Sequence, residues 1–469
     1  MADTAKPIDP RWAWEPYRVD ERRAPWDALK VGHLFRRAAF GATMAEINQA
    51  VKDGPDKTIH RLLAGGPGLE VFEQSTGEVA DTIAKGNNGQ LLRAWWLNRL
   101  LYSPHPLREK ITLFWHNHFA TSNTKVQNAR FMLGQYELMK RHALGSFEKM
   151  LQEISKDPAM LVWLDTRGSK KGNPNENYAR EIMELFALGV GNYTETDVRE
   201  AARAFTGWEI QGNDAHFNAS AHDDGEKKVL GQSGTFKGED IVRICLEQPC
   251  AAKFIVTKFF RFMVSETIAP TPELIDPLAA KFKASGYDFG VVVNTVLRSN
   301  LFFSKEAYRS RIKSPVEFAV GIVHVLEGKI GTTQLAVELE KLGQNVFFPP
   351  SVKGWDGGPT WLNGQTLLYR QNLGLALTST EDARFNNRID PAKLVVKYVQ
   401  KTDEQILTFF LVLLLQHDLP QESLQRLAEY QKKARSQTLP VYWTEADATA
   451  HRVRSLCHLI LSLPEFQLD

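Results

Sequence analysis

Two histidines stand two residues apart in the segment Phe114-Trp115-His116-Asn117-His118-Phe119. On an extended strand such a pair points to one side, as metal ligands often do, but on a helix the two rings lie about 200° apart. The preceding apolar spacing is helical, so His116 and His118 can bind one metal only if the helix ends near His116. The alternative is two buried histidines whose ring nitrogens are satisfied by hydrogen bonds.

A second polar segment, residues 173–186, reads NPNENYAREIMELF. Asn173 as N-cap, Pro174 at the first helical position and Glu176 three residues after the cap predict a capping box. This prediction explains all three residues structurally, so we do not expect a catalytic role for Glu176.

Further along the same expected helix, Asn177, Glu181 and Glu184 share one side. Two carboxylates three residues apart repel each other unless a positive charge lies near them. Arg180, a protonated His116 or a bound cation can supply that charge. Either this face is a site, with Glu181 as a ligand or a general base that activates water, or it is a solvated, ion-paired surface.

The segment His222-Asp223-Asp224-Gly225 contains a third group of polar residues. Asp224-Gly225 between two extended runs predicts a hairpin turn with positive φ. Turn geometry does not explain His222 and Asp223, because a histidine beside a carboxylate can also ligate a metal or act as a general base. The alternative is an ordinary polar surface turn.

The loop from Phe347 to Asn363 is rich in proline and glycine and contains Trp355 and Trp361. Two flat indole faces held by a rigid loop can bind a sugar or a peptide. The alternative is a structural brace between two lobes of the protein.

The elements that must position these residues are mainly helices, because apolar residues recur with helical spacing and rarely alternate. Thr194 and Asp197 mark a helix start over 195–205. Short extended runs between 208 and 230 predict a small β-hairpin insertion. We expect a large, mostly α fold with two lobes, divided as an N-terminal extension 1–30, a single helical domain 31–468, lobe one at about 31–207, the insertion at 208–237 and lobe two at about 238–468.

The composition of the chain argues against a nucleic-acid binder and against a membrane-spanning protein. The 469 residues carry 57 Lys and Arg against 55 Asp and Glu, a net charge of +2, which argues against a dedicated nucleic-acid binder. The longest apolar run, Ile406–Leu415, is only about half as long as a membrane-spanning helix, so we expect a buried helix there. Three cysteines predict reduced thiols. The first residues show no apolar signal core, so the cytoplasm is the default expectation.

Several segments, in this order, resemble the bacterial family known as domain of unknown function 1800, and the resemblance runs from about Gly32 to Leu468. The matching segments read WHNHFATS at 115–122, PNENYARE at 174–181, ELF at 184–186, AFTGW at 204–208, HD-x-G at 222–225, LG at 230–231 and PP-x-VKGW at 349–355. One departure from the family pattern is Ser169, where an asparagine is expected. The resemblance implies a mostly helical protein with no established activity. It also implies a partner, because members are often encoded beside a sulfatase-like family that carries a twin-arginine signal. Export together with such a partner is then the alternative to the cytoplasm.

Our leading hypothesis is a hydrolase-type enzyme whose polar pocket holds a divalent metal. His116, His118 and His222 are its candidate metal ligands. Glu181, Glu184, Arg180 and Asp223 are the catalytic candidates, with Arg180 stabilising an anion and Asp223 orienting a ligand. Asn177, Trp355 and Trp361 are the candidate substrate-binding residues. The alternatives are a non-catalytic helical scaffold or export companion for the sulfatase-like partner, and a carbohydrate or cell-wall binding protein.

Overall fold

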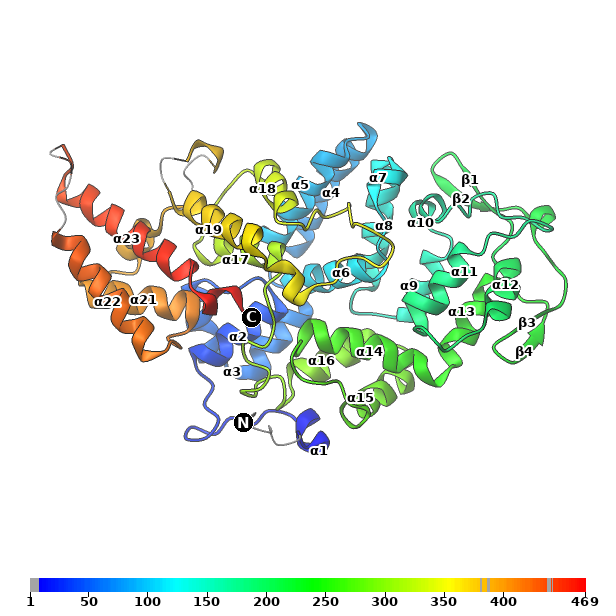
Figure 1. The fold of residues 1–469 in the computed structure, drawn as a ribbon, viewed down its shortest axis with the longest axis horizontal. Coiled ribbons are helices and arrows are strands. Elements are labelled where there is room, and N and C mark those ends of the chain that lie inside the picture. The colour runs from blue at the N-terminus through cyan, green and yellow to red at the C-terminus, as the bar shows by residue number, and fades with distance from the viewer. Residues whose placement is uncertain (1–7, 380–381, 386–388, 437–439, 441) are drawn as a thin grey trace.

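The computed structural model describes residues 8–379, 382–385, 389–436, 440 and 442–469. The molecule is elongated, with the C-terminal helices at one end and the strands at the other (Figure 1). The C-terminal residues lie near its middle. The expected extension 1–30 is described from residue 8 onward, and residues 1–7 lie outside the described part.

Helices make up most of the described chain, which confirms the predicted mostly α class. Those before the first strand are α1 (Pro10–Trp14), α2 (Ala28–Ala38), α3 (Met44–Ala64), α4 (Leu69–Lys85), α5 (Gly89–Tyr102), α6 (Pro106–His118), α7 (Asn123–Val126), α8 (Ala129–His142), α9 (Phe147–Ile154), α10 (Pro158–Trp163), α11 (Asn177–Glu181), the π-helix η1 (Ile182–Ala187) and α12 (Glu195–Ala204). Those after the last strand are α13 (Gly238–Glu247), α14 (Pro249–Met263), α15 (Pro272–Ala284), α16 (Phe289–Leu297), α17 (Pro315–Val325), α18 (Thr332–Lys341), α19 (Gly364–Thr378), α20 (Pro391–Lys397), α21 (Asp403–Leu415), α22 (Gln421–Ser436) and α23 (Glu445–Leu461). Short 3-10 helices are η2 (Ala219–Ala221), η3 (Gly358–Trp361), η4 (Ala383–Phe385) and η5 (Pro464–Gln467).

The strands form two separate antiparallel hairpins in the expected insertion. In the first, β1 (Trp208–Gln211) pairs with β2 (Asp214–Phe217); in the second, β3 (Lys227–Val229) pairs with β4 (Gln232–Gly234). The first hairpin turns at Gly212, as its sequence predicts. Asp224-Gly225 is not the turn of the second hairpin, so that prediction was wrong. The side chain of Asp223 instead accepts the backbone N–H of Gly225, 3.0 Å away, and the hairpin turns at Leu230-Gly231.

The predicted capping box at residues 173–176 is also wrong, because helix α11 begins only at Asn177. Asn173 pairs with Lys170 through its backbone, and Asn175 donates its N–H to the hydroxyl of Ser169 at 2.9 Å. The side chain of Asn175 in turn accepts the N–H of Asn177. These loop contacts outweigh the local capping preference. By contrast, the box of Thr194 and Asp197 forms as predicted.

Helix α6, which carries both histidines, is fixed by a buried charged group. Glu109 of α6 is fully buried and accepts hydrogen bonds from Arg99 of α5 at 2.7 Å and from Tyr136 of α8 at 2.9 Å. A buried ion pair of this kind contributes little net stability, but removing one partner costs about 3–5 kcal/mol. This buried group therefore fixes the positions of helices α5, α6 and α8 relative to one another.

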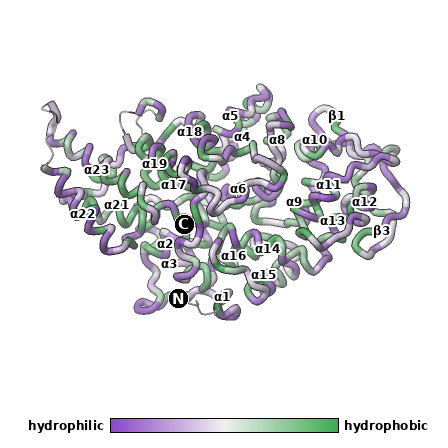
Figure 2. The backbone as a smooth tube through the Cα atoms, in the orientation of Figure 1, coloured by the Kyte–Doolittle hydropathy of each residue, from purple (hydrophilic) through white to green (hydrophobic). Residues whose placement is uncertain are grey.

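Elements on both sides of the β insertion pack together in the centre. Helix α18 lies along α5, and α17 contacts α5 and α19 (Figure 1). Apolar segments are concentrated in helices such as α17 and α21, while α22 and the loops beside the strands are more hydrophilic (Figure 2). Helix α21 contains the apolar run Ile406–Leu415 and is largely buried, as expected. The division into two lobes at the insertion stays a prediction.

None of the helices in the described residues is both long and apolar enough to span a membrane. Cys245, Cys250 and Cys457 are free thiols, as the sequence predicts.

Candidate functional site

His116 lies on a part of α6 that is still helical, because the helix continues to His118. Its ring is fully buried, and Nε2 accepts the backbone N–H of Phe347 at 3.0 Å. The ring packs against Trp96, with 5.0 Å between centroids, and burial lowers the pKa of His116 to about 3. The ring is therefore neutral, and because Nε2 accepts, the proton must sit on Nδ1.

His118 points to a different part of the molecule. Its Nε2 lies 3.0 Å from the carbonyl oxygen of Phe186, and its Nδ1 lies 3.3 Å from the ammonium of Lys258. Because Lys258 can only donate, Nδ1 accepts and Nε2 carries the proton. Burial and the Lys258 charge hold the pKa of His118 well below its usual range. Both ring nitrogens are thus used in hydrogen bonds.

Asn117, between the two histidines, joins α6 to the tryptophan-containing loop. Its side-chain oxygen accepts the N–H of Trp355 at 2.7 Å, and its amide donates to the carbonyl of Trp355 at 3.2 Å. Gly354 adopts φ +81°, and a Cβ there would lie 2.3 Å from the Asn117 side-chain oxygen. This close approach requires glycine. No local sequence signal marks Asn117 as the residue that joins these two segments, because its partner lies 238 residues away.

Trp355 and Trp361 are only 9% and 8% exposed. The carbohydrate-binding hypothesis required exposed indole faces, so neither ring meets its condition. The Trp355 ring lies 5.7 Å from that of His116. These contacts match the alternative interpretation of the loop as a structural brace.

His222 and Asp223 are bonded to helix α12 and the residues after it. His222 Nδ1 lies 3.0 Å from the carbonyl of Thr206, whose hydroxyl accepts the N–H of Asp223 at 2.8 Å. Asp223 also forms an ion pair with Arg203 at 2.8 Å. Hydrogen bonding to Arg203 lowers the pKa of Asp223 to about 2, so this carboxylate stays ionised. Sequence reasoning missed Arg203, because it precedes the whole first hairpin in the chain.

The three predicted metal ligands therefore have three different sets of neighbours. His116 contacts Phe347, His118 contacts Phe186 and Lys258, and His222 contacts Thr206. In the part of the chain that the structure describes, no three His, Cys, Asp or Glu side chains are grouped so that they could hold a metal ion. The described residues thus give the predicted divalent-metal site no support.

On the acidic helix, two of the candidates are bonded to neighbouring segments. Asn177 donates its side-chain amide to the carbonyl of Leu164 at 2.8 Å. Arg180 forms two parallel 2.8 Å hydrogen bonds to the carboxylate of Glu195 and lies 3.3 Å from Glu176. Glu176 stands four residues before Arg180, whereas Glu195 belongs to the first turn of α12.

Glu184 lies in the π-helix η1, which follows α11 directly. π-helical turns are rare and are frequently found at functional sites. Glu184 accepts a hydrogen bond from the Tyr193 hydroxyl at 2.8 Å. Burial and this bond raise the pKa of Tyr193 to about 12, so the phenol remains a donor.

Glu181, at the end of α11, differs from every other charged candidate. It is partly buried, and it makes no hydrogen bond or ion pair with any residue that the structure describes. Burial, together with the negative charge of Glu184, raises its pKa to about 7, although Arg180 opposes that shift. A carboxyl group with this pKa can both give and take a proton near neutral pH.

Lys258 of α14 lies against the other end of the π-helix. It donates to the carbonyl of Leu185 at 2.9 Å as well as to His118, and burial lowers its pKa to about 8. Nothing in the local sequence pattern of α14 marks this lysine.

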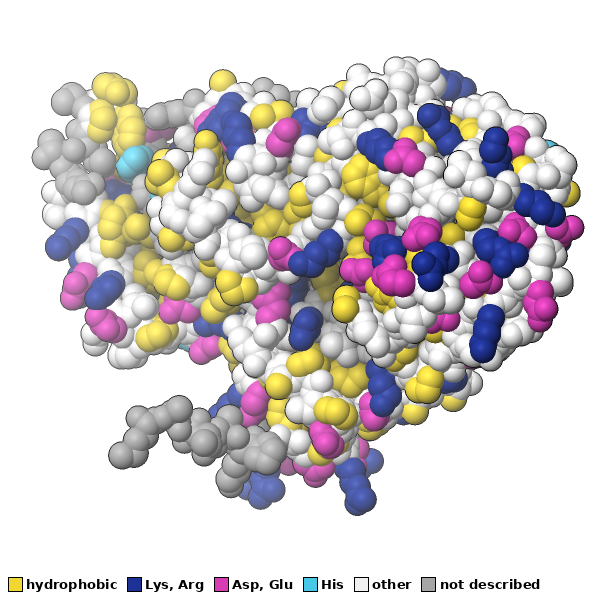
Figure 3. All heavy atoms as spheres, turned by 45° about the vertical axis from the view of Figure 1, so that its right-hand side comes forward, with side chains coloured by type: hydrophobic (Ala, Val, Ile, Leu, Met, Phe, Trp, Pro, Cys, Tyr) yellow, Lys and Arg dark blue, Asp and Glu magenta, His cyan; other side chains and the backbone are white. Residues whose placement is uncertain are grey.

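The surface charges show no large region of one sign in the view of Figure 3. On this face, acidic and basic side chains alternate closely over the half of the molecule that contains the strands.

Comparison with known proteins identifies one family for residues 33–468. No curated protein and no solved structure matches it. A family model described as a protein of unknown function, DUF1800, matches residues 33–468. Because this match covers nearly every residue, the chain belongs to the DUF1800 family.

Proposed function

We propose that this protein is a hydrolase-type enzyme in which Glu181 transfers the proton. The observation that carries the proposal is that Glu181 alone among the charged candidates has no hydrogen-bond or ion-pair partner in the described residues. Burying a carboxyl group without a partner costs stability, so a fold retains one where another role requires it. Its pKa of about 7 suits general acid–base chemistry at neutral pH.

In this proposal the two carboxyl groups have different tasks. Glu181 takes a proton from an attacking water and returns it to the leaving group. Glu184 accepts a hydrogen bond from the Tyr193 hydroxyl, and its negative charge helps to raise the pKa of Glu181. The predicted histidine ligands are bonded to three different segments, so the proposal assigns the proton transfer to Glu181 and not to a group at the histidines.

The test combines a titration with a substrate screen. Carbon-13 NMR of labelled glutamate, assigned with Glu181→Gln, is expected to show one carboxyl group that titrates near 7. Chromogenic esters, phosphates, sulfates and glycosides are then screened against the native protein and two variants. We expect turnover to fall about 100-fold or more in Glu181→Gln and to persist in Glu239→Gln, an exposed carboxylate of α13. Titration of Glu181 near 4.5, or equal turnover in both variants, would overturn the proposal.

A second candidate, a non-catalytic scaffold or export companion for a sulfatase-like partner, is favoured by a different observation. His116, Asn117 and His118 are all hydrogen-bonded to other segments, including backbone atoms of residues 186, 347 and 355. Polar residues used in this way fix packing and need no substrate. This candidate predicts that no hydrolytic activity depends on Glu181 and that the protein copurifies with its partner.

A further inference from the structure

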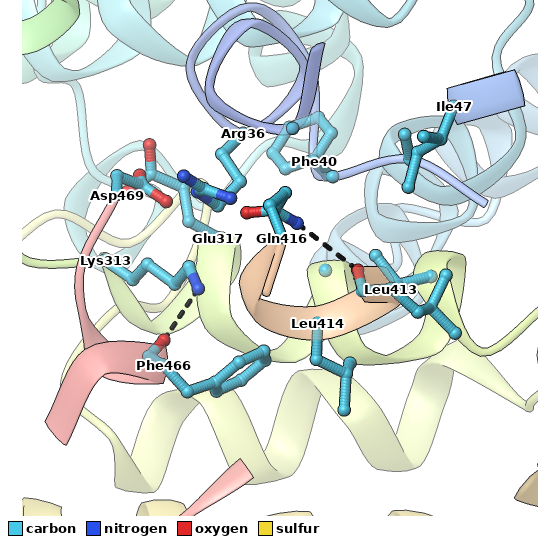
Figure 4. A pocket seen from close by; sticks show the side chains of 15 residues that line it. Arg36, Phe40, Ile47, Lys313, Glu317, Leu413, Leu414, Gln416, Phe466 and Asp469 are labelled. Atoms are coloured by element: carbon cyan, nitrogen blue, oxygen red, sulfur yellow. Dashed lines mark hydrogen bonds between the residues drawn. The ribbon is translucent and has the colours of Figure 1, made fainter. Parts of the chain in front are cut away.

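A cavity of about 20 Å³ lies among α2, α17, α21 and the C-terminal residues 466–469, away from the π-helix (Figure 4). Its polar lining residues are Arg36, Lys313, Glu317, Gln416 and Asp469, and the other lining side chains are apolar. A buried water needs about 10–15 Å³ of such volume. The cavity therefore has room for an occupant of water or halide size.

Arg36 points into this cavity without a carboxylate partner of its own (Figure 4). Its residue is 7% exposed, and its Nε and Nη2 atoms are buried with no hydrogen-bond partner among the described residues. The Arg36 guanidinium also forms no ion pair with any described residue. The ring of Tyr308, whose centroid is 5.6 Å from the guanidinium carbon, offsets only part of the charge. A guanidinium group keeps its charge in a protein, so Nε and Nη2 of Arg36 favour a hydrogen-bond acceptor beside them.

Two carboxylates line the cavity, and Glu317 is already paired with other groups. Glu317 lies 2.6 Å from the ammonium of Lys110 and 3.4 Å from Arg311, and it also accepts the N–H of Ser314. Asp469 lies 3.7 Å from Arg311, its carbonyl oxygen accepts a hydrogen bond from Arg37 at 3.2 Å, and its Oδ2 is a buried acceptor with no hydrogen-bond partner in the described residues. Neither carboxylate forms an ion pair with Arg36 in the part of the chain that the structure describes.

The wider surroundings carry more buried positive than negative side chains. The buried acidic side chains around the cavity are Glu317 and Asp469, and the partly buried Glu266 lies 3.8 Å from Arg311. The buried basic side chains are Arg36, Arg37, Lys110, Arg311, Lys313 and Arg370. Burial lowers the pKa of Lys313 to about 7, and the charge of Arg36 contributes to this shift. Buried charges are normally paired, so this group has room for a negative charge.

We propose that the cavity binds one small monovalent inorganic anion of the size of chloride. The anion accepts hydrogen bonds from Nε and Nη2 of Arg36, and the Lys313 ammonium lies beside it. Lys313 already donates to the carbonyl of Phe466 at 2.6 Å. The anion would thus join α2 to the C-terminal residues 464–469 and stabilise this junction. The competing occupant is a water, because Gln416 Oε1 and Asp469 Oδ2 are buried acceptors with no hydrogen-bond partner in the described residues.

Bromide distinguishes an anion from a water in the native protein. Crystals grown or soaked in sodium bromide are expected to show an anomalous peak within hydrogen-bond distance of the Arg36 guanidinium. Ordered water alone at this position, with no anomalous peak, would overturn the proposal. This measurement does not depend on any variant folding.

Thermal unfolding gives the second measurement. At equal ionic strength, the midpoint in sodium chloride is expected to exceed that in sodium gluconate by about 2 °C or more and to reach a plateau. Arg36→Gln should lose this difference, and Arg61→Gln, whose side chain is 41% exposed on α3, should keep it. Equal midpoints of the native protein in both salts, or the same chloride response in both variants, would count against the anion.

Discussion

The end of helix α6 and the start of the π-helix contain equally polar sequences but use their side chains differently. At the end of α6, His116, Asn117 and His118 are all hydrogen-bonded to distant segments. At the start of the π-helix, Glu181 has no such bond in the described residues. The two regions meet, since His118 bonds the carbonyl of Phe186 within the π-helix.

This difference separates two roles that the sequence did not distinguish. Bonded polar side chains hold segments together, so their loss is expected to lower stability. A partly buried carboxyl group without a partner weakens the fold when it is charged, so its loss is expected to raise stability. Stability measurements on matched variants therefore test the distinction without knowledge of a substrate.

The largest effect is expected for His118→Ala. This change removes a buried ring, leaves a cavity beside Phe114 and Phe119, and breaks the bonds to Phe186 and Lys258. Cavity formation and lost hydrogen bonds together predict a loss of about 3–5 kcal/mol in the free energy of unfolding, measured by urea denaturation.

His60→Ala is the matched control, because His60 is exposed on α3. Its expected effect is within about 0.5 kcal/mol. If His118→Ala lowered the free energy of unfolding no more than His60→Ala does, the end of α6 would not be a structural brace. The proposed difference between α6 and the π-helix would then be wrong for α6.

Local signals explain which parts of the fold could be predicted from the sequence. The box of Thr194 and Asp197, the helix that carries His116 and His118, and the buried run Ile406–Leu415 all depend on neighbours within a few residues. The capping box predicted at Asn173 does not form, because contacts within the loop before α11 replace the weak local preference for helix capping.

The candidate site was harder to predict, because partners are set by the tertiary fold. His116 bonds to a residue 231 positions away, and His118 to one 68 positions away. The sequence identified Glu181 and Glu184 through helical spacing, but it could not show that one is bonded and the other is not. Nor did it reveal the π-helix, which changes that spacing from Ile182 onward.

A smaller, pH-dependent effect is expected for Glu181→Gln. The folded protein binds the Glu181 proton more tightly than the unfolded chain, so this group's contribution to stability is full below about 4.5 and is lost as the pH rises through about 7. A rise of the pKa from 4.5 to about 7 corresponds to about 3 kcal/mol in a buried site, and partial exposure reduces the expected difference to about 1–2 kcal/mol.

The variant should therefore be more stable than the native protein at pH 8 and nearly equal to it at pH 5. Chemical denaturation at both values measures this difference. Glu239→Gln, on the exposed surface of α13, should show no such pH dependence. A variant that is less stable at pH 8 would mean that Glu181 has a favourable partner, and the contrast with α6 would disappear.

The smallest change in stability is expected for Arg180→Gln. Arg180 is partly exposed and pairs with the exposed Glu195. Surface ion pairs of this kind contribute about 0–1 kcal/mol.

The same variant should also change the pKa of Glu181. The positive charge of Arg180 lowers this pKa, so removing the charge should move the pKa of Glu181 above 7. Carbon-13 NMR of labelled glutamate measures this shift, and urea denaturation measures stability. An unchanged pKa would mean that Arg180 does not act on Glu181 through charge. A loss of stability as large as that of His118→Ala would mean that the face around Glu181 is itself a brace.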